Sequence, residues 1–172
     1  LSYGPFGPQH EDAVPLLDRA LRDSDPEVRA EACMTYREFL DVRDDVPESV
    51  IAALLHDPSM DVRGAAASTL AFQWRRNPSL LPSVDTGLIV PPLVKLLMAK
   101  QVHHQYQAMG CLAQLGPATR PALVGLGAAP SPIVRQFVNR QLDQFDAAEK
   151  PAAESRESAS EPDGGQNPEP CP

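Results

Sequence analysis

Two adjacent histidines, His103 and His104, are candidate metal ligands, because imidazole nitrogens commonly bind transition metals. Neighbouring residues of a helix point about 100° apart, so this pair cannot face one metal ion without a third contributor. The nearest carboxylates in the sequence, Asp85 and Asp143, are distant. We therefore predict no metal site, and expect a turn at which one imidazole packs and the other is exposed.

The three cysteines form no recognisable metal or disulfide pattern. Cys33, Cys111 and Cys171 lack the C-x-x-C spacing of zinc and redox sites, and an odd number defines no disulfide framework. Two of them stand where a small apolar residue would serve, so we expect ordinary buried thiols. Free thiols, together with the lack of a basic and apolar leader after Leu1, favour a cytoplasmic protein.

Motifs of the common hydrolase, metallopeptidase and nucleotide-binding families are missing from the sequence. The chain contains no G-x-S-x-G, H-E-x-x-H, Walker or Rossmann pattern. Gly125 and Gly127 follow no predicted strand, which argues against a phosphate-binding loop. We therefore predict a protein without catalytic residues and without a cofactor.

The composition indicates packed helices. Of 172 residues, 42% are hydrophobic but only 5% are aromatic, and alanine and leucine are abundant, which favours helices over a sandwich or barrel. No stretch approaches the ~18–20 consecutive apolar residues of a membrane span. The net charge of −8 is unevenly spread, since residues 62–140 hold eight basic residues against Asp85 alone, a local balance of +7. This segregation is either an ordinary solvated surface or a gradient that steers partners.

Four segments align as repeats when they are registered on one position. That position is held by Val28, Val62, His104 and Val134, at spacings of 34, 42 and 30 residues. A leucine or isoleucine stands eleven residues earlier, an alanine or valine four residues later, and a large apolar residue eight residues later. Such spacings are typical of arrays of helical pairs, each with an apolar face that only a neighbouring pair can cover. We therefore predict an all-α solenoid of about four stacked helical hairpins over residues 11–147.

Local signals predict the turns and the core of these pairs. Asp25 and Asp61 stand where the second helix of a pair begins, and a carboxylate there can cap the helix. The segment 77–87 contains two prolines and a glycine, so we expect an extended loop. The repeat register predicts nearly complete burial for three leucines: Leu55, Leu97 and Leu112.

A family resemblance is carried by the segments DPEVRAEA, DVRGAAASTL and AQLGPATRPALVGL. They resemble HEAT repeats, especially the short bacterial type similar to bilin-lyase repeats, over residues 6–146. The resemblance implies an armadillo-like superhelix in which Asp and Arg of adjacent repeats form a ladder. The third unit departs from the pattern, because His104-Gln105 replaces the Val-Arg pair of the other units. Residues 1–10 resemble the end of a preceding repeat, since Phe6-Gly7-Pro8 matches Leu115-Gly116-Pro117.

Two enzyme groups built on such repeats are weaker matches. His10-Glu11 resembles one metal-binding pair of deoxyhypusine hydroxylase, a HEAT-repeat enzyme that holds two irons with several such pairs, and a single pair cannot assemble that site. Nothing diagnostic of bilin-lyase activity is visible. A lyase-like or enzyme-accessory module that holds a small molecule or tetrapyrrole in its groove is the alternative to a non-catalytic scaffold.

Protein binding is the function that the resemblance favours. It implies that the second helices of the pairs line a concave face, with positions 2, 3, 6 and 10 after the registered residue directed outward. We predict that these positions bind a peptide or helix of another protein through Met34, Phe72, Tyr106, Phe137 and Arg140. If the register is wrong by one residue, some of these side chains belong to the core instead. Nucleic-acid binding is disfavoured by the acidic net charge and by the ladder positions of Arg63 and Arg135.

The last segment, residues 148–172, differs in composition from the repeats. From Lys150 onward it is rich in Pro, Glu, Ser and Gly and contains no Leu, Ile, Val, Phe, Tyr or Trp. Such a sequence cannot bury enough apolar surface to offset the entropy of ordering, so we predict a disordered acidic tail.

Overall fold

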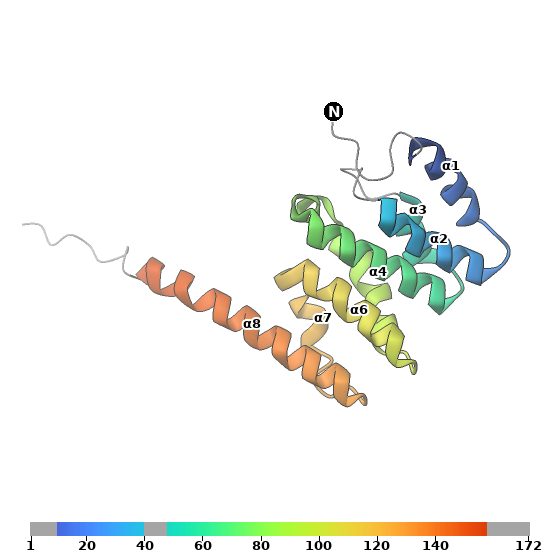
Figure 1. Ribbon diagram of the computed structural model, residues 1–172. Helices are drawn as coiled ribbons and strands as arrows, with labels where there is room; N and C mark the ends of the chain where they lie inside the picture. The colour runs from blue at the N-terminus through green and yellow to red at the C-terminus, as the bar shows by residue number, and fades with distance from the viewer. Residues whose placement is uncertain (1–9, 40–47, 158–172) are drawn as a thin grey trace, which may run out of the picture.

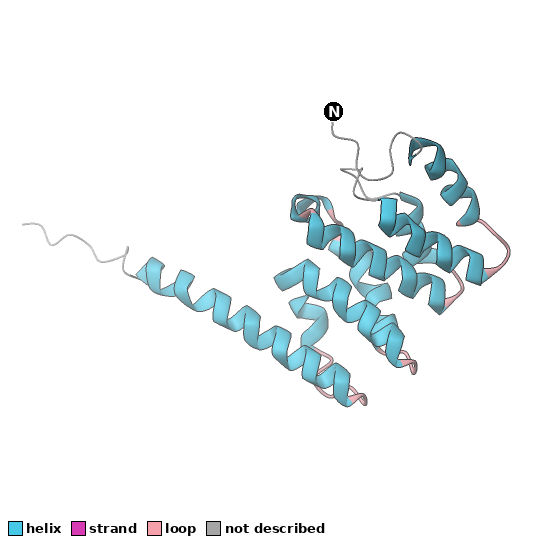
Figure 2. Cartoon of the chain, viewed as in Figure 1, coloured by secondary structure: helices cyan, strands magenta, loops and turns pink. Residues whose placement is uncertain are grey.

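The chain folds into pairs of helices. The computed structural model describes residues 10–39 and 48–157, with side chains described for residues 13–37 and 48–149. All regular secondary structure in these ranges is helical (Figure 2), which confirms the predicted all-α class. The elements are α1 (His10–Ala20), α2 (Pro26–Phe39), α3 (Glu48–His56), α4 (Met60–Arg76), η3 (Pro78–Ser83), α5 (Thr86–Leu97), α6 (Val102–Leu115), η4 (Gly116–Thr119), α7 (Arg120–Val124) and α8 (Pro132–Glu157), where η denotes a 3-10 helix.

The second helices of the pairs form one layer of the stack. Helix α2 packs against α4, α4 against α6, and α6 against α8, and Figure 1 shows these helices side by side. In the other layer α3 contacts α5 and α5 contacts α7, while each first helix packs against the second helix of its own pair. This arrangement is the predicted α-solenoid, in which each pair covers the apolar face of the next.

Small residues bring the helices of the α2–α4–α6–α8 layer close together. The alanines four residues after the registered position, Ala32, Ala66 and Ala108, are 4%, 0% and 0% exposed. Gly110 of α6 faces Ala71 of α4 so closely that a Cβ at Gly110 would lie 3.8 Å from the Cβ of Ala71. Side chains of one carbon or none at these contacts allow two backbones to pack at high density.

The registered position itself is buried wherever a helix lies on both sides. Val62, His104 and Val134 are 0%, 2% and 0% exposed, as the alignment predicts. Val28 is 39% exposed, because no helix among the described residues lies beyond α2 in this layer. The same apolar position therefore has a different environment in the first pair.

The prediction of nearly complete burial is wrong for one of the three leucines. Leu97 and Leu112 are fully buried, but Leu55 is only half-buried. The buried stripe of α3 is instead carried by Leu54, together with Val50 and Ala53. These positions follow the i, i+3, i+4 pattern of one helical face. The buried face of α3 is therefore shifted by one residue relative to the face that the repeat alignment predicted.

The segment 77–87 is not the extended loop that its prolines and glycine predicted. Pro78–Ser83 forms the 3-10 helix η3, which packs against α4, and α5 already begins at Thr86. Pro78 is compatible with this structure because its ring fits the first turn of a helix, where its missing N–H has no partner to lose. Asp85 caps α5, accepting hydrogen bonds from the backbone N–H groups of Gly87 at 2.9 Å and Leu88 at 3.3 Å.

The two predicted capping aspartates differ in the structure. Asp25 caps α2, because its Oδ1 accepts a hydrogen bond from the backbone N–H of Glu27 at 2.9 Å. Asp61 is not a cap, since α4 begins at Met60 and the residue before it is Ser59. Asp61 lies within the first turn of α4, and its side chain reaches α6 instead.

The last helix extends past the boundary predicted at residue 147. Helix α8 continues to Glu157. Alanine and glutamate are frequent between residues 147 and 157, and both are strong helix formers, so a tail without large apolar residues is compatible with a helix there. Residues 158–172, and residues 1–9 of the predicted preceding repeat, lie outside the described residues.

In the first, third and fourth units, the residue after the registered position holds the turn between the two helices of its pair. Nη1 of Arg29 donates to the carbonyl oxygens six and five residues earlier, at 2.8 and 3.0 Å, and Nη1 of Arg135 does the same at 2.7 and 3.0 Å. In the third unit Gln105 stands at this position, and its Nε2 donates to the carbonyl oxygen six residues earlier at 2.8 Å. The third unit therefore keeps this turn contact without an arginine.

The polar contacts that link successive pairs use different residue types along the stack. Arg29 bridges to Asp57 of the next pair with two hydrogen bonds, Nε to Oδ2 at 2.7 Å and Nη2 to Oδ1 at 3.0 Å. The hydroxyl of Ser131 donates to Oε1 of Gln105 at 3.0 Å, which links the fourth unit to the third. Between the second and third units the corresponding link is made by Asp61 and two histidines.

Candidate functional site

A groove between α4 and α6 brings aromatic and basic side chains together. It has a volume of about 220 Å³, and its lining includes Arg37 of α2, Phe72 and Arg75 of α4, and Tyr106 and Gln107 of α6. We call it the α4–α6 groove. Two of the predicted partner-binding residues, Phe72 and Tyr106, lie in it, although they are 34 positions apart in the sequence.

Three arginines surround the aromatic ring of Phe72. The guanidinium carbons of Arg37, Arg75 and Arg76 lie 5.2, 5.6 and 5.5 Å from the ring centroid. Guanidinium groups within about 6 Å of an aromatic face are attracted by its quadrupole. Phe72 itself is half-buried. Its ring therefore lies at the edge of the groove with three positively charged groups around it.

Tyr106 is the exposed aromatic residue of the groove. The residue is 59% exposed, as the outward position predicted. The neighbouring Gly110 leaves the floor of the groove open, because a glycine adds no side chain between α4 and α6. The groove therefore offers an apolar ring, a phenol hydroxyl and guanidinium groups on one surface.

The other predicted partner-binding residues lie away from this groove. Met34 of α2 and Phe137 of α8 are half-buried and pack against the hydrophobic core. Arg140 is exposed on α8. None of the three belongs to the lining of the α4–α6 groove. Tyr106 therefore shares a groove with Phe72 and not with Phe137.

Sequence reasoning did not select the arginines of the groove. Arg37 follows the buried Tyr36 near the end of α2, and Arg75 is in the last turn of α4. Both lie more than two turns after the registered position, beyond most of the outward positions that we considered. Their nearness to Phe72 depends on how far α2 and α4 are offset in the stack.

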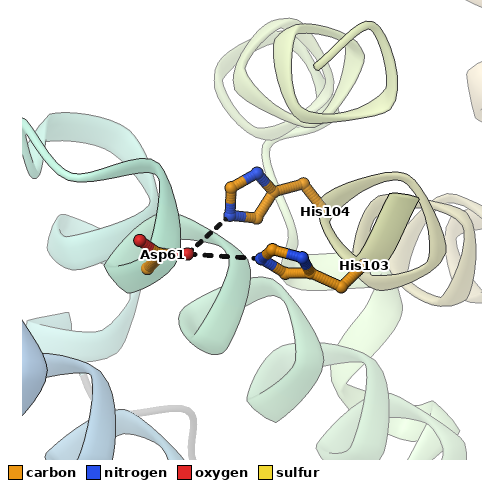
Figure 3. Close-up of side chains that lie close together, drawn as sticks. All are labelled: Asp61, His103 and His104. Carbon is orange, nitrogen blue, oxygen red and sulfur yellow. Dashed lines mark hydrogen bonds and ion pairs between the residues drawn. The ribbon is translucent and has the colours of Figure 1, made fainter. Parts of the chain in front are cut away.

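A second cluster joins the first turns of α4 and α6 (Figure 3). Oδ1 of Asp61 lies 2.9 Å from Nε2 of His104 and 3.2 Å from Nε2 of His103. His104 is 2% exposed at the side chain, whereas His103 and Asp61 are 58% and 70% exposed. The expectation of one packed and one exposed imidazole is confirmed.

The expectation that the two imidazoles lack a third contributor is wrong. Their rings lie with centroids 4.0 Å apart, and both direct a nitrogen toward the same carboxylate. That carboxylate belongs to Asp61, 42 residues before His103, and not to Asp85 or Asp143. A signal was present in the repeats, since Asp61 and His103 both stand one position before the registered residue and so meet on adjacent helices.

Hydrogen bonding and close packing stabilise this cluster. The hydrogen bonds from His104 and His103 lower the pKa of the Asp61 carboxyl, so it is a carboxylate at neutral pH. Gly64 of α4 makes room for the imidazole of His104, because a Cβ there would lie 3.3 Å from Cδ2 of His104 and would also meet the side chain of Gln107. Gly64 lies one turn beyond Asp61, and its missing Cβ leaves space chiefly for Gln107 and also for His104.

A cavity of about 310 Å³ lies on the side of the stack formed by α1 and α3, with Asp18, Ser49 and His56 in its lining. Oδ1 of Asp18 accepts hydrogen bonds from the hydroxyl of Tyr36 at 2.7 Å and from the hydroxyl of Ser49 at 2.8 Å. These bonds tie together α1, α2 and α3. The carboxylate of Asp18 therefore has a structural role.

The cysteines of the described residues are free and buried. Cys33 and Cys111 are both 0% exposed, which confirms the prediction for two of the three thiols. Burial raises the pKa of the Cys33 thiol to about 12 and also raises that of Cys111. Because the thiolate is the reactive form, neither residue is suited to nucleophilic chemistry. The side chains of His10 and Glu11, the other candidate metal pair, lie outside the described residues.

Within the parts of the chain that the structure describes, no helix combines the length and the apolar character that a membrane span needs.

Comparison with known families extends the structural result. Residues 6–71 match the family model of HEAT repeats, a segment that ends inside α4 and so covers the first two helical pairs. A comparison with curated proteins gives no match for this sequence. The match agrees with the stacked helical pairs and with the bridge between Arg29 and Asp57. Residues 6–71 are therefore similar to HEAT repeats, and the later helical pairs continue the same stacked arrangement.

Proposed function

We propose that this protein is a non-catalytic scaffold whose α4–α6 groove binds an acidic segment of another protein. HEAT repeats generally mediate protein–protein interaction. The observation that carries the proposal is the set of three guanidinium groups around Phe72, beside the exposed Tyr106. Arginine and tyrosine are the residue types that contribute most to protein interfaces.

The chemistry of the groove favours a carboxylate-bearing partner. A guanidinium fork matches the geometry of a carboxylate and can donate two parallel hydrogen bonds to it. The basic balance of residues 62–140, eight basic residues against Asp85, extends this preference beyond the groove itself. An acidic segment with an aromatic or aliphatic side chain would satisfy both the arginines and the ring of Tyr106.

The proposed surface continues along the same layer of helices. Met34 on α2 and Phe137 and Arg140 on α8 are part of the proposal, because they belong to the helices that flank α4 and α6. Met34 and Phe137 are half-buried, so we expect them to contribute less than Tyr106. A partner helix or extended peptide could follow this layer from one pair to the next.

The first experiment identifies the partner and tests the groove. The full chain is used for affinity capture with mass spectrometry, and the affinity of the captured partner is then measured for Tyr106→Ala and Arg75→Gln. Each change is expected to weaken binding by about 1–4 kcal/mol, since interface anchors of these types have that range. Lys95→Gln is the control, because Lys95 is exposed on α5 in the other layer.

The same measurements decide against the proposal if both groove variants remain folded and bind as tightly as the parent. Loss of binding in Phe137→Ala but not in Tyr106→Ala would move the site to α8. If no protein binds, a thermal-shift panel of metals and tetrapyrroles tests the alternative of a small molecule in the groove. A rise in melting temperature with a tetrapyrrole that Tyr106→Ala abolishes would replace the scaffold proposal.

A further inference from the structure

We propose that Asp61, His103 and His104 form a binding site for a divalent transition-metal ion of the zinc type. The three residues each offer one ligand atom, and these atoms all lie within 4.8 Å of one another. Figure 3 shows both imidazole rings directed at the carboxylate from the start of α6. The proposal does not depend on the function of the α4–α6 groove.

The distances are close to those that a tetrahedral ion needs. Zinc lies about 2.0–2.2 Å from imidazole nitrogens and carboxylate oxygens, which separates two ligand atoms by about 3.4 Å in a tetrahedron. In the present geometry Oδ1 of Asp61 is 2.9 Å from Nε2 of His104 and 3.2 Å from Nε2 of His103. An ion would be admitted by widening these two distances by a few tenths of an ångström and by bringing the three ligand atoms, which lie within 4.8 Å of one another, around a common centre.

The donor set selects a class of metal. Two imidazoles and one carboxylate suit zinc, cobalt and nickel, whereas magnesium and calcium prefer sites made only of oxygen atoms. Three protein ligands leave a fourth position for water. The ion would replace the hydrogen bonds between the imidazoles and Asp61, so both imidazoles would coordinate in their neutral form.

The surroundings make the site accessible and partly preorganised. His104 is 2% exposed and is held in the helix interface, whereas Asp61 and His103 are 70% and 58% exposed, so an ion can enter from solvent. Gly64 removes the Cβ that would crowd the imidazole of His104.

Two features limit the affinity. Metal-binding histidines usually donate their second ring N–H to a partner, but the buried Nδ1 of His104 has no hydrogen-bond partner among the described residues. The site also lies at the N-terminal ends of α4 and α6, where the helix dipoles disfavour a cation. We therefore expect dissociation constants in the micromolar range rather than those of a structural zinc centre.

Metal binding would reinforce one particular joint of the stack. The first and second pairs are joined by Arg29 and Asp57, but His104-Gln105 takes the place of a Val-Arg pair in the third unit. An ion held by Asp61, His103 and His104 would crosslink α4 to α6 at this joint, where His104 already packs against Gly64. Bound metal should therefore raise the thermal stability of the protein.

The test uses the full chain after treatment with a chelator and dialysis. Zinc chloride is titrated by calorimetry, and cobalt chloride is titrated by visible absorption, because tetrahedral cobalt has a characteristic spectrum. We expect one saturable site, a higher melting temperature with zinc and no comparable effect of magnesium. Asp61→Asn and His103→Ala should each weaken zinc binding at least tenfold, which is about 1.4 kcal/mol.

The variants are chosen so that unfolding cannot imitate the result. Asp61 and His103 are exposed, so their substitution should leave the circular dichroism spectrum unchanged, whereas His104→Gln alters a buried position. His56→Gln is the matched control, because His56 is exposed on α3 and belongs to no such cluster in the described residues. The proposal is overturned if zinc at millimolar concentration does not bind, or if both exposed variants bind it as tightly as the parent.

Discussion

At the scale of single residues, the bridge between Arg29 and Asp57 joins the first two helical pairs by a two-fold hydrogen-bonded ion pair. The two side chains are only 12% and 8% exposed, and the pair makes two hydrogen bonds. Burial opposes ionisation of the Asp57 carboxyl, but the hydrogen bonds from Arg29 and from the backbone N–H of Ser59 outweigh it and lower its pKa. Folding therefore favours the ionised carboxylate.

This lowered pKa predicts a pH-dependent effect of Asp57→Asn. A carboxyl group whose pKa is lower in the folded state contributes stability above its unfolded pKa of about 4, and loses it as the pH falls through the folded value. We expect the variant to melt about 2–6 °C below the parent at pH 7, and the difference to shrink below pH 4. Thermal unfolding followed by circular dichroism between pH 3 and pH 7 measures it.

Asp143→Asn is the control for this experiment, because Asp143 is exposed on α8. Equal melting temperatures of the Asp57→Asn variant and the parent at pH 7 would show that the bridge does not stabilise the stack.

At the scale of helices, stability depends on which face of each helix the neighbouring pair covers. Helix α6 packs against α4, α5 and α8 and buries seven of its residues: His104, Gln105, Ala108, Met109, Cys111, Leu112 and Leu115. Helix α5 packs against α6 and exposes Leu88 at 59%. Two leucines on adjacent helices therefore have opposite environments.

Leu112→Ala should destabilise the protein strongly, whereas Leu88→Ala should not. Leu112 is 0% exposed, so its truncation loses the transfer free energy of the side chain and leaves a cavity, at a cost of about 2–5 kcal/mol. The exposed Leu88 should change the free energy of unfolding by no more than about 0.5 kcal/mol. Urea denaturation of both variants gives the comparison, and an unchanged midpoint for Leu112→Ala would contradict the repeat register.

At the scale of the whole molecule, charge is separated along the stack. Twelve acidic residues lie between residues 11 and 48 and five in the C-terminal segment, while residues 62–140 carry a balance of +7. After Lys150 the chain has five acidic residues and one arginine. We propose that this acidic segment competes weakly with an acidic partner for the basic part of the surface.

Competition by the C-terminal segment predicts that a chain ending at Lys150 binds the partner more tightly than the full chain. The difference should shrink at high salt, since screening weakens attraction between exposed charges. Replacing the five acidic residues with neutral ones, in a chain of unchanged length, separates charge from length. Equal affinities of the full and shortened chains at low salt would eliminate the competing segment.

The sequence by itself determined the class of fold and most of the core. The positions shared by the four repeats predicted burial of Ala32, Ala66 and Ala108, and the packing of Leu97 and Leu112, because a helical period fixes which side chains share one face. It also predicted the exposure of Tyr106. Periodicity within a helix is local, so it can be read without knowing the neighbours.

Only the tertiary structure decided which faces meet. A rotation of α3 by one position placed Leu54 rather than Leu55 in the core, and the offset between helices brought Arg37 to Phe72. The same stacking placed the carboxylate of Asp61 against His103 and His104, although 42 residues separate it from the nearer of them. These contacts depend on the rotation and offset of one helix against the next, and the spacing of residues along a single helix does not specify either quantity.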